Sequence, residues 1–258
     1  MPTISVDFVY PGSDLDTTMP RASYLKGPAK LFVSSASWKV EDDDFRLDGK
    51  FAFKGKGFKR VINWKKSRVD SVKFGYWVDD YDWDWEVSGL GLKGNKFVDF
   101  ASKDPSGKSF YDFITGSGAV FWSDSVDGVP LQGGPGADHF NTQHSGDVIT
   151  GGGGADVISV VHGETARIKD FNASEGDRLE VIARRKGFVS IPAYEVVDLS
   201  LASVQYSPAE GATYVRVGVS GASSAASGGT TFVLEGVTGF DLGRLSVGEP
   251  RADLSWFW

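Results

Sequence analysis

Short alternations of apolar and polar residues dominate the pattern along the chain. Runs rich in β-branched and aromatic residues lie between turn signals at residues 31–40, 46–55, 212–220 and 230–237. Such runs are typical of half-buried strands. Residues 222–229, ASSAASGG, indicate a flexible loop between the last two runs. Because no long amphipathic helical pattern interrupts this series, the sequence predicts an all-β chain.

A second pattern, with a period of nine residues, occupies the middle of the chain. Large apolar residues recur at every ninth position, at Trp122, Leu131, Phe140, Ile149 and Ile158. Residues 133–141 and 151–159 both fit the frame GGxGxDxUx, in which U is a large apolar residue. Residues 142–150 lack the glycine pair but keep Asp147 and Ile149. A fixed period this short predicts a solenoid, in which each repeat buries its apolar residue against its neighbours.

The frame also predicts how successive turns are arranged. The first six residues of each frame predict a turn, in which glycine supplies left-handed backbone at low cost, and the last three predict a short strand. If two frames complete one coil, the turns at residues 133–138 and 151–156 stack on one side, and the turn at 142–147 lies on the other. Backbone carbonyls and an aspartate then line the space between stacked turns. These are the oxygen ligands that calcium prefers.

Composition restricts the classes of protein that fit this pattern. Glycine makes up 33 of the 258 residues, about twice the usual share, and eight of the glycines fall within residues 133–159. The net charge of −7 argues against a nucleic-acid partner, because such proteins usually carry a basic surface. The absence of cysteine excludes disulfides and thiolate metal sites. No apolar run is long enough to predict a transmembrane segment.

The two complete frames resemble the calcium-binding repeats of RTX (repeats-in-toxin) exoproteins. Residues 167–181, RIKDFNASEGDRLEV, resemble the segment with which such repeats usually end. The resemblance implies a short parallel β-roll at residues 115–165, after an N-terminal β-domain at 1–114 and before a C-terminal β-rich cap at 166–258. It also implies export by a type I secretion apparatus that reads an uncleaved C-terminal signal. The expected location is therefore extracellular, in solution or at a cell surface.

The resemblance further implies which residues would hold about two or three calcium ions. Carbonyls of one turn combine with carbonyls and the aspartate of the turn two frames later. The main expected site joins Gly133, Pro135 and Ala137 to Gly152, Gly154 and Asp156. A second joins the turn that begins at Thr115 to Gly134, Gly136 and Asp138, and a weaker third joins the turn at Asp124 to Gln143, Ser145 and Asp147. Asp170 and Asp177 match the positions that cap the last turns.

Two segments of the N-terminal part each leave alternatives open. Residues 79–87, DDYDWDWEV, alternate so that Tyr81, Trp83 and Trp85 share one face of a predicted strand. This face either packs in a core or forms an exposed aromatic row that binds a glycan or another extracellular ligand, with a further cation site as a third possibility. The lysine-rich residues 54–66 predict a solvated hairpin, with a polyanion-binding patch as the alternative.

Motifs typical of enzymes do not occur in the sequence. It has no HExxH, GxSxG, P-loop or GxGxxG motif. The three histidines, His139, His144 and His162, lie in or beside the repeats. His139 and His144 occupy variable frame positions, where exposed turn histidines are expected, with a zinc pair as the alternative. The preferred hypothesis is a non-catalytic, calcium-binding exoprotein that folds on binding calcium after export and contacts a surface, matrix or ligand. The alternative is a small secreted hydrolase carried on an RTX export module.

Overall fold

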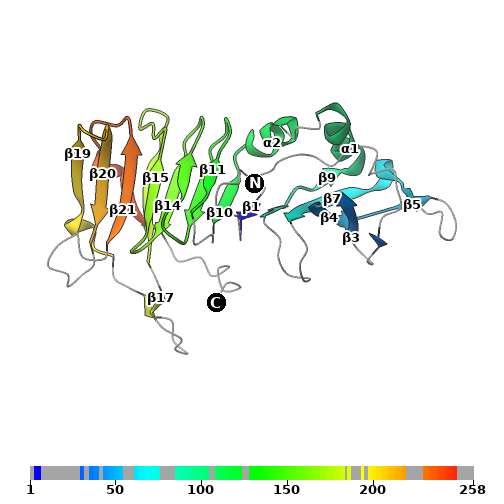
Figure 1. Ribbon diagram of the computed structural model, residues 1–258, viewed down its shortest axis with the longest axis horizontal. Coiled ribbons are helices and arrows are strands. Elements are labelled where there is room, and N and C mark those ends of the chain that lie inside the picture. The colour runs from blue at the N-terminus through cyan, green and yellow to red at the C-terminus, as the bar shows by residue number, and fades with distance from the viewer. Residues whose placement is uncertain are drawn as a thin grey trace. The chain divides into compact units, whose positions relative to one another are not determined.

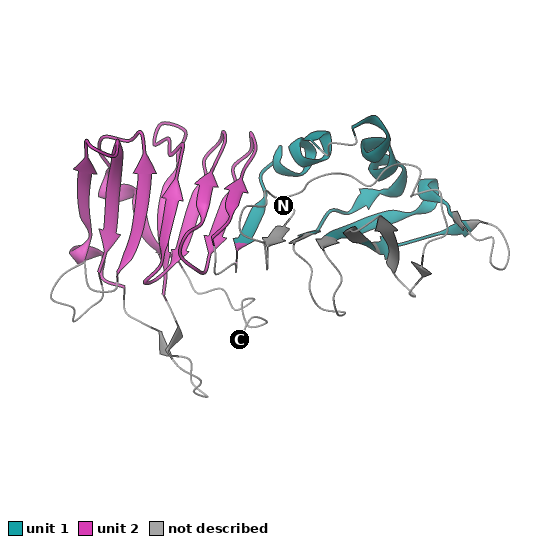
Figure 2. Ribbon diagram, in the orientation of Figure 1, with its two compact units in different colours: residues 1–122 teal, residues 123–258 magenta. Residues whose placement is uncertain are grey.

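The computed structural model divides the chain into two compact units, residues 1–122 and 123–258 (Figure 2). It describes residues 3–6, 30–31, 35–40, 43–54, 61–75, 85–104, 108–123, 128–183, 185–186, 193–194, 197–218 and 229–248. The division falls a few residues after the end expected for the N-terminal domain, at residue 114. The acidic C-terminal residues that were expected to carry the export signal lie partly outside the described residues. No described helix is long and apolar enough to span a membrane.

Unit 1 is built on an antiparallel sheet (Figure 1). In spatial order its strands are β2 (Lys30–Leu31), β3 (Ser35–Val40), β4 (Asp43–Lys50), β7 (Arg68–Gly75), β8 (Trp85–Ser88) and β1 (Thr3–Val6), and β9 (Leu92–Lys93) also pairs with β7. A separate pair, β5 (Phe53–Lys54) and β6 (Val61–Ile62), precedes the 3-10 helix η3 (Trp64–Lys66). Leu47, Val69, Val72 and Val87 are completely buried, so one face of this sheet forms the core of unit 1.

Two α-helices in unit 1 show that the prediction of an all-β chain is wrong. They are α1 (Gly94–Lys103) and α2 (Lys108–Thr115), and α1 contacts β7, β9 and η3. The rings of Phe97 and Phe110 meet edge to face with centroids 5.9 Å apart, and both side chains are buried. The sequence did not predict these helices, because each is short and contains aromatic residues, which are more frequent in strands. In this segment, tertiary packing decides the structure.

Unit 2 contains two rows of strands that run in parallel for most of their extent. One row consists of β12 (His139–Thr142), β14 (Val157–Val161), β16 (Arg178–Ile182) and β22 (Leu245–Gly248). The other consists of β11 (Pro130–Gln132), β13 (Val148–Thr150), β15 (Thr165–Ile168), β21 (Thr230–Glu235), β20 (Ala212–Val217) and β19 (Ser203–Ser207). The short elements are β17 (Arg185–Lys186), β18 (Ala193–Tyr194), η4 (Leu199–Leu201) and η5 (Leu242–Arg244), and β10 (Val120–Ser123) crosses the boundary between the units.

Strand direction in unit 2 also corrects the expected architecture. The pairs β11–β13, β13–β15 and β15–β21 are parallel, whereas β21–β20 and β20–β19 are antiparallel. The C-terminal strands do not form a separate cap, because β21 and β22 extend the two rows begun by the repeats. The chain therefore contains mixed sheets and helices instead of a simple parallel roll between two β segments.

The nine-residue apolar series forms the core of unit 2. Leu131 pairs in register with Ile149, and Phe140 with Ile158, and each of these four side chains is at most 1% exposed. The paired residues are 18 positions apart, as expected if two frames complete one coil. The first member of the series departs from this pattern. Trp122 is only partly buried, and its neighbour Phe121 is the completely buried side chain of β10.

Candidate metal centre

Two turns of the repeat region lie side by side and contain the main expected site. These paired turns are residues 133–138, between β11 and β12, and residues 151–156, between β13 and β14. The backbone N–H of Gly153 donates to the carbonyl of Gly134 at 2.8 Å, and that of Val157 donates to the carbonyl of Asp138 at 2.9 Å. The structure thus brings together the two complete frames of the sequence, as the 18-residue register requires.

Glycine is required in the paired turns because the two backbones approach closely. A Cβ at Gly133 would lie 2.0 Å from the carbonyl oxygen of Gly151, and a Cβ at Gly152 would lie 2.1 Å from that of Gly134. Gly152 and Gly154 also have left-handed backbone, with φ of 89° and 105°. Gly134 does not adopt this conformation, so left-handed glycine is a feature of the second turn only.

Carboxylates connect each coil of unit 2 to the next by accepting backbone hydrogen bonds. Oδ1 of Asp156 accepts from the N–H of Asp138 at 2.8 Å, and Oδ1 of Asp177 accepts from the N–H of Asp156 at 2.9 Å. Asp170 accepts from the N–H groups of Gly151 and Gly152 at 2.8 and 2.9 Å. Asp170 and Asp177 therefore hold the end of the turn stack, in the positions that the sequence resemblance implied for capping residues.

One oxygen of Asp156 differs from the others at this edge. Asp156 is completely buried, and its Oδ2 has no hydrogen-bond partner within the described part of the chain. The same oxygen lies over the α-carbon of Gly151, only 2.2 Å from where a Cβ would stand. In the preceding coil, by contrast, Oδ2 of Asp138 accepts from the N–H of Gly134 at 2.8 Å. Asp156 thus presents a buried acceptor that no donor satisfies.

The electrostatic setting of Asp156 disfavours a bare negative charge. Burial is the largest cause that raises the pKa of the Asp156 carboxyl, and the negative charges of Asp177, Asp138 and Asp170 act in the same direction. Against the lowering effect of the Asp138 N–H, they raise this pKa to about 7. Burial likewise raises the pKa of Asp177. A proton or a bound cation would relieve the repulsion among these four carboxylates.

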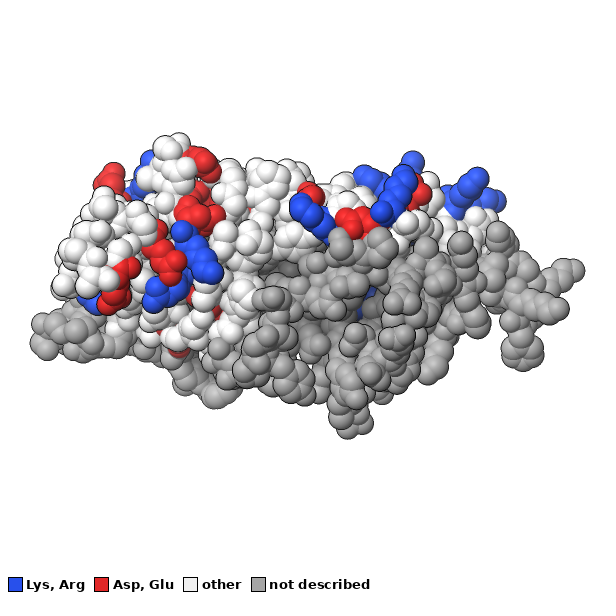
Figure 3. Space-filling model, turned by 45° about the horizontal axis from the view of Figure 1, so that its top comes forward, with Lys and Arg blue, Asp and Glu red and all other residues white. Residues whose placement is uncertain are grey.

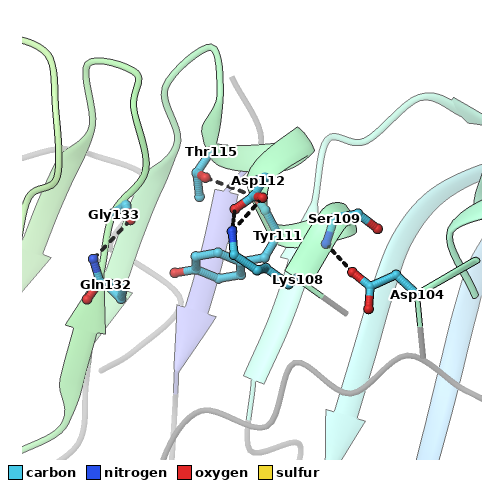
Figure 4. Close-up of polar contacts among 8 residues, drawn as sticks. All are labelled: Asp104, Lys108, Ser109, Tyr111, Asp112, Thr115, Gln132 and Gly133. Carbon is cyan, nitrogen blue, oxygen red and sulfur yellow. Dashed lines mark hydrogen bonds and ion pairs between the residues drawn. The ribbon is translucent and has the colours of Figure 1, made fainter. Parts of the chain in front are cut away.

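Backbone carbonyls around Asp156 remain available to a cation. The carbonyls of Pro135, Ala137, Gly152 and Gly154 accept no backbone hydrogen bond from any described residue. The carbonyl of Gly133 receives only a 3.3 Å contact from its neighbour's amide, Nε2 of Gln132 (Figure 4). Carbonyl and carboxylate oxygens suit calcium. The described residues contain no group of three or more His, Asp or Glu side chains placed to hold a metal.

The opposite edge of unit 2 carries a related aspartate with different neighbours. Oδ1 of Asp147 accepts from the N–H of Val129 at 2.9 Å and from Oγ of Ser123 at 3.1 Å. Its Oδ2 is buried and has no hydrogen-bond partner among the described residues. Burial raises the pKa of Asp147 to about 6, although the bonds from Val129 and Ser123 and the nearby His144 act in the lowering direction.

Ser145, another member of this weaker expected site, makes two hydrogen bonds through its side chain. Oγ of Ser145 donates to Oε2 of Glu164 at 2.6 Å and accepts from the N–H of Thr165 at 3.0 Å. The Ser145 side chain is therefore bonded to the following turn. The preceding turn, which begins at Asp124, lies outside the described residues except for its last positions.

The segment at Thr115 is a helix end instead of the expected glycine turn. Thr115 is the last residue of α2, and its hydroxyl donates to the carbonyl of Tyr111 at 2.9 Å (Figure 4). Its own carbonyl accepts from the N–H of Gly118 at 3.0 Å, which closes the helix. The second expected site would join this segment of unit 1 to Gly134, Gly136 and Asp138 of unit 2. The helix removes the turn geometry on which that expectation depended.

The aromatic residues proposed for ligand binding lie largely outside the described residues. Tyr81 and Trp83 belong to residues 76–84, which are not described, and Trp85 is the first residue of β8. Val87, which continues the same alternation, is completely buried. Burial at Val87 agrees with the core-packing interpretation of that face.

A hydrogen-bonded group on the repeat strands was not foreseen from the sequence. Nε2 of His139 lies 2.7 Å from Oγ of Ser159, which donates to Oε2 of Glu180 at 3.0 Å. Ser159 is completely buried, and the carboxylate contacts the serine instead of the far side of the imidazole. This order differs from that of a nucleophilic Ser-His-acid triad, so the group fits a structural link across β12, β14 and β16. His139 is therefore not the exposed turn residue that the sequence suggested, because it lies in β12 and is only partly exposed.

Comparison with known proteins adds no relative from which a function could be transferred. No family model, no curated protein and no solved structure matches this chain.

Proposed function

We propose that the chain is a calcium-binding exoprotein of the RTX type, without catalytic activity of its own. The observation that carries the proposal is Oδ2 of Asp156, a buried carboxylate oxygen that lacks a donor and lies among three further carboxylates. An unsatisfied buried acceptor is costly for a fold. A divalent cation would satisfy this oxygen and offset the mutual repulsion at the same time.

The residues that would hold the ion are those of the paired turns. Asp156 would supply the carboxylate, and the uncommitted carbonyls would supply neutral oxygens, namely those of Gly133, Pro135, Ala137, Gly152 and Gly154. Asp147 is the candidate for a second, weaker position, because it too has a buried oxygen without a donor. When bound, the ion would contribute positive charge and fixed coordination to turns that few side chains hold together.

Calcium binding would couple the folding of unit 2 to the surroundings of the protein. Glycine loses more conformational freedom on folding than any other residue, and eight glycines fall within residues 133–159. Sites of this type in extracellular modules bind calcium with dissociation constants on the order of 10⁻⁴–10⁻³ M, so they are empty in a cytosol and fill outside the cell. This supports a secreted protein, exported by a type I apparatus, whose repeats fold after export.

Calcium titration of the purified full chain tests the proposal. We expect isothermal titration to show binding in the submillimolar to millimolar range, and Asp156→Asn to weaken it strongly. Magnesium should bind far more weakly, because it demands a smaller, near-octahedral set of ligands. Asp99→Asn is the matched control: Asp99 is exposed on α1, where its carboxylate lies 3.8 Å from Lys103, and α1 contains no expected ligand. Absence of calcium binding, or equal binding by both variants, would refute the proposal.

A further inference from the structure

Three basic residues of unit 1 face one another directly across neighbouring strands. Arg68 of β7 is the register partner of Lys50 in β4 and of Lys93 in β9. Register partners in antiparallel strands point to the same face of a sheet. Lys50, Arg68 and Lys93 therefore form a row across the sheet, here called the basic row, that spans two strand spacings or roughly 10 Å.

The basic row lies on the solvent face of the sheet. Lys50, Arg68 and Lys93 are exposed, and the Arg68 side chain is 60% accessible. The residues next to them in the strands, Val69 and Leu92, point the other way and are buried. Two further exposed lysines, Lys65 and Lys66, lie in η3 immediately before β7.

Little negative charge offsets the row. Nε of Arg68 donates to Oδ1 of Asp70 at 2.5 Å. Neither Lys50 nor Lys93 is within ion-pair distance of a carboxylate of the described residues, and the same holds for the two lysines of η3. Elsewhere in unit 1, exposed lysines do have partners. Lys108 lies 2.7 Å from Asp112 (Figure 4), and Lys103 lies 3.8 Å from Asp99.

Fold stability does not explain the basic row. Like charges that stand directly opposite one another destabilise a sheet. On the face drawn in Figure 3, basic and acidic side chains of unit 1 lie close to one another. A concentrated positive surface on a chain with a net charge of −7 points to an anionic ligand.

We propose that the basic row binds a polysaccharide that carries carboxylate or sulfate groups. The row offers one cation per strand spacing, roughly 4.8 Å, which suits charges spaced by sugar residues. Duplex DNA presents one phosphate per about 1.7 Å. The net charge of −7 disfavours duplex DNA and a charged membrane, because partners of these kinds usually meet a broad basic surface. This inference goes beyond the proposed function and is independent of calcium, since the row belongs to unit 1.

Binding of the full chain to three polymers with the same backbone tests this assignment. Dextran sulfate and carboxymethyl dextran carry the two anionic groups, and uncharged dextran is the control. We expect the wild type to bind one or both anionic polymers, with an affinity that falls as salt is added. Lys50→Gln/Lys93→Gln should weaken this binding roughly tenfold, since exposed charge contacts are individually small. Lys103→Gln/Lys108→Gln removes the same charge from ion-paired positions and should change it less than about twofold.

Each outcome supports or overturns the assignment. Equal weakening by the two double variants means that overall charge, not the row, drives binding. Tighter binding to a duplex oligonucleotide, or to phosphatidylserine-containing vesicles, assigns the row to another class of partner. Failure of all anionic polymers to bind excludes the proposal. Thermal unfolding of both variants verifies that each is folded, and a calcium titration of the same samples shows whether the metal proposal stands or fails separately.

Discussion

The backbone N–H of Asp138 donates a 2.8 Å hydrogen bond to Oδ1 of Asp156, the equivalent aspartate one coil later. The two carboxylates are thereby held in neighbouring turns, where their like charges repel each other. Asp156 therefore accepts a structural hydrogen bond through Oδ1, whereas its Oδ2 has no donor among the described residues.

The two buried aspartates of the repeats should differ in their effect on calcium binding. We expect Asp156→Ala to lower calcium affinity and melting temperature more than Asp147→Ala, because only Asp156 lies beside two complete glycine turns. Loss of even an indirect partner of a metal commonly lowers affinity roughly 10- to 100-fold. Parallel calcium titrations and melting curves measure the difference. Equal losses would show that the pairing of complete turns does not determine the site.

Stability in the absence of calcium should fall as the pH rises. The pKa of Asp156 is about 7 and that of Asp147 about 6 in the fold, against 3.8 as the ordinary value. Between about pH 4 and pH 7, the folded state therefore binds more protons than the unfolded state. The stability that the two protonated groups contribute is complete below about pH 4 and is lost as the pH passes through 6 and 7.

Denaturant unfolding in chelator at pH 4.5, 6 and 7.5 measures this loss. One pKa unit corresponds to about 1.4 kcal/mol, so the change should be on the order of a few kcal/mol. Asp156→Asn serves as the reference, because it removes the titrating group while other carboxylates remain. A wild type whose pH dependence equals that of Asp156→Asn would contradict the prediction. Saturating calcium should reduce the difference between the two proteins.

Calcium should also control access of proteases to the repeats. In chelator we expect cleavage within residues 133–159, because the glycine-rich turns lose the ion that offsets their repulsion and ordering entropy. Millimolar calcium should restore both protection and the β signal in circular dichroism. Equal resistance in the two conditions would mean that the turns fold without the ion and that folding is not coupled to export.

Glycine should be indispensable at one position of the paired turns. Gly152→Ala would place a Cβ 2.1 Å from the carbonyl oxygen of Gly134 and impose a φ of 89° on alanine. We expect a loss of at least about 1–3 kcal/mol in the free energy of unfolding. Gly239→Ala is the control, because nothing lies within 4 Å of a Cβ there, and it should change stability by less than about 0.5 kcal/mol.

Sequence reasoning succeeded where a short-range repeat determines the structure. The period of nine predicted the pairing of Phe140 with Ile158 and the side-by-side position of the two glycine turns, because a regular coil leaves little other choice. It failed at α1 and α2, because their apolar patterns are too short to predict helices and the helices depend on the packing of Phe97 against Phe110. It also failed for the C-terminal strands, whose parallel partners lie far away in the chain.

The candidate sites also differ in whether a local sequence pattern could reveal them. Asp156 could be identified from its place in the frame, and Asp170 and Asp177 from their resemblance to an exit segment. The basic row could not be identified, because the register that aligns Lys50 with Arg68 depends on an irregularity between Asp48 and Gly49. The hydrogen-bonded link from His139 to Glu180 likewise depends on three strands whose alignment no local pattern reveals.

The pairing of β21 with β15 has a consequence for how the chain folds. Ala166 and Phe232 are register partners 66 residues apart, and Leu179 pairs with Leu245 in the other row at the same separation. Until these distant partners meet, both rows present open apolar edges, which invite association with other copies of the chain. The fraction of the purified protein that refolds should therefore fall as its concentration rises, even where its finished fold is sound.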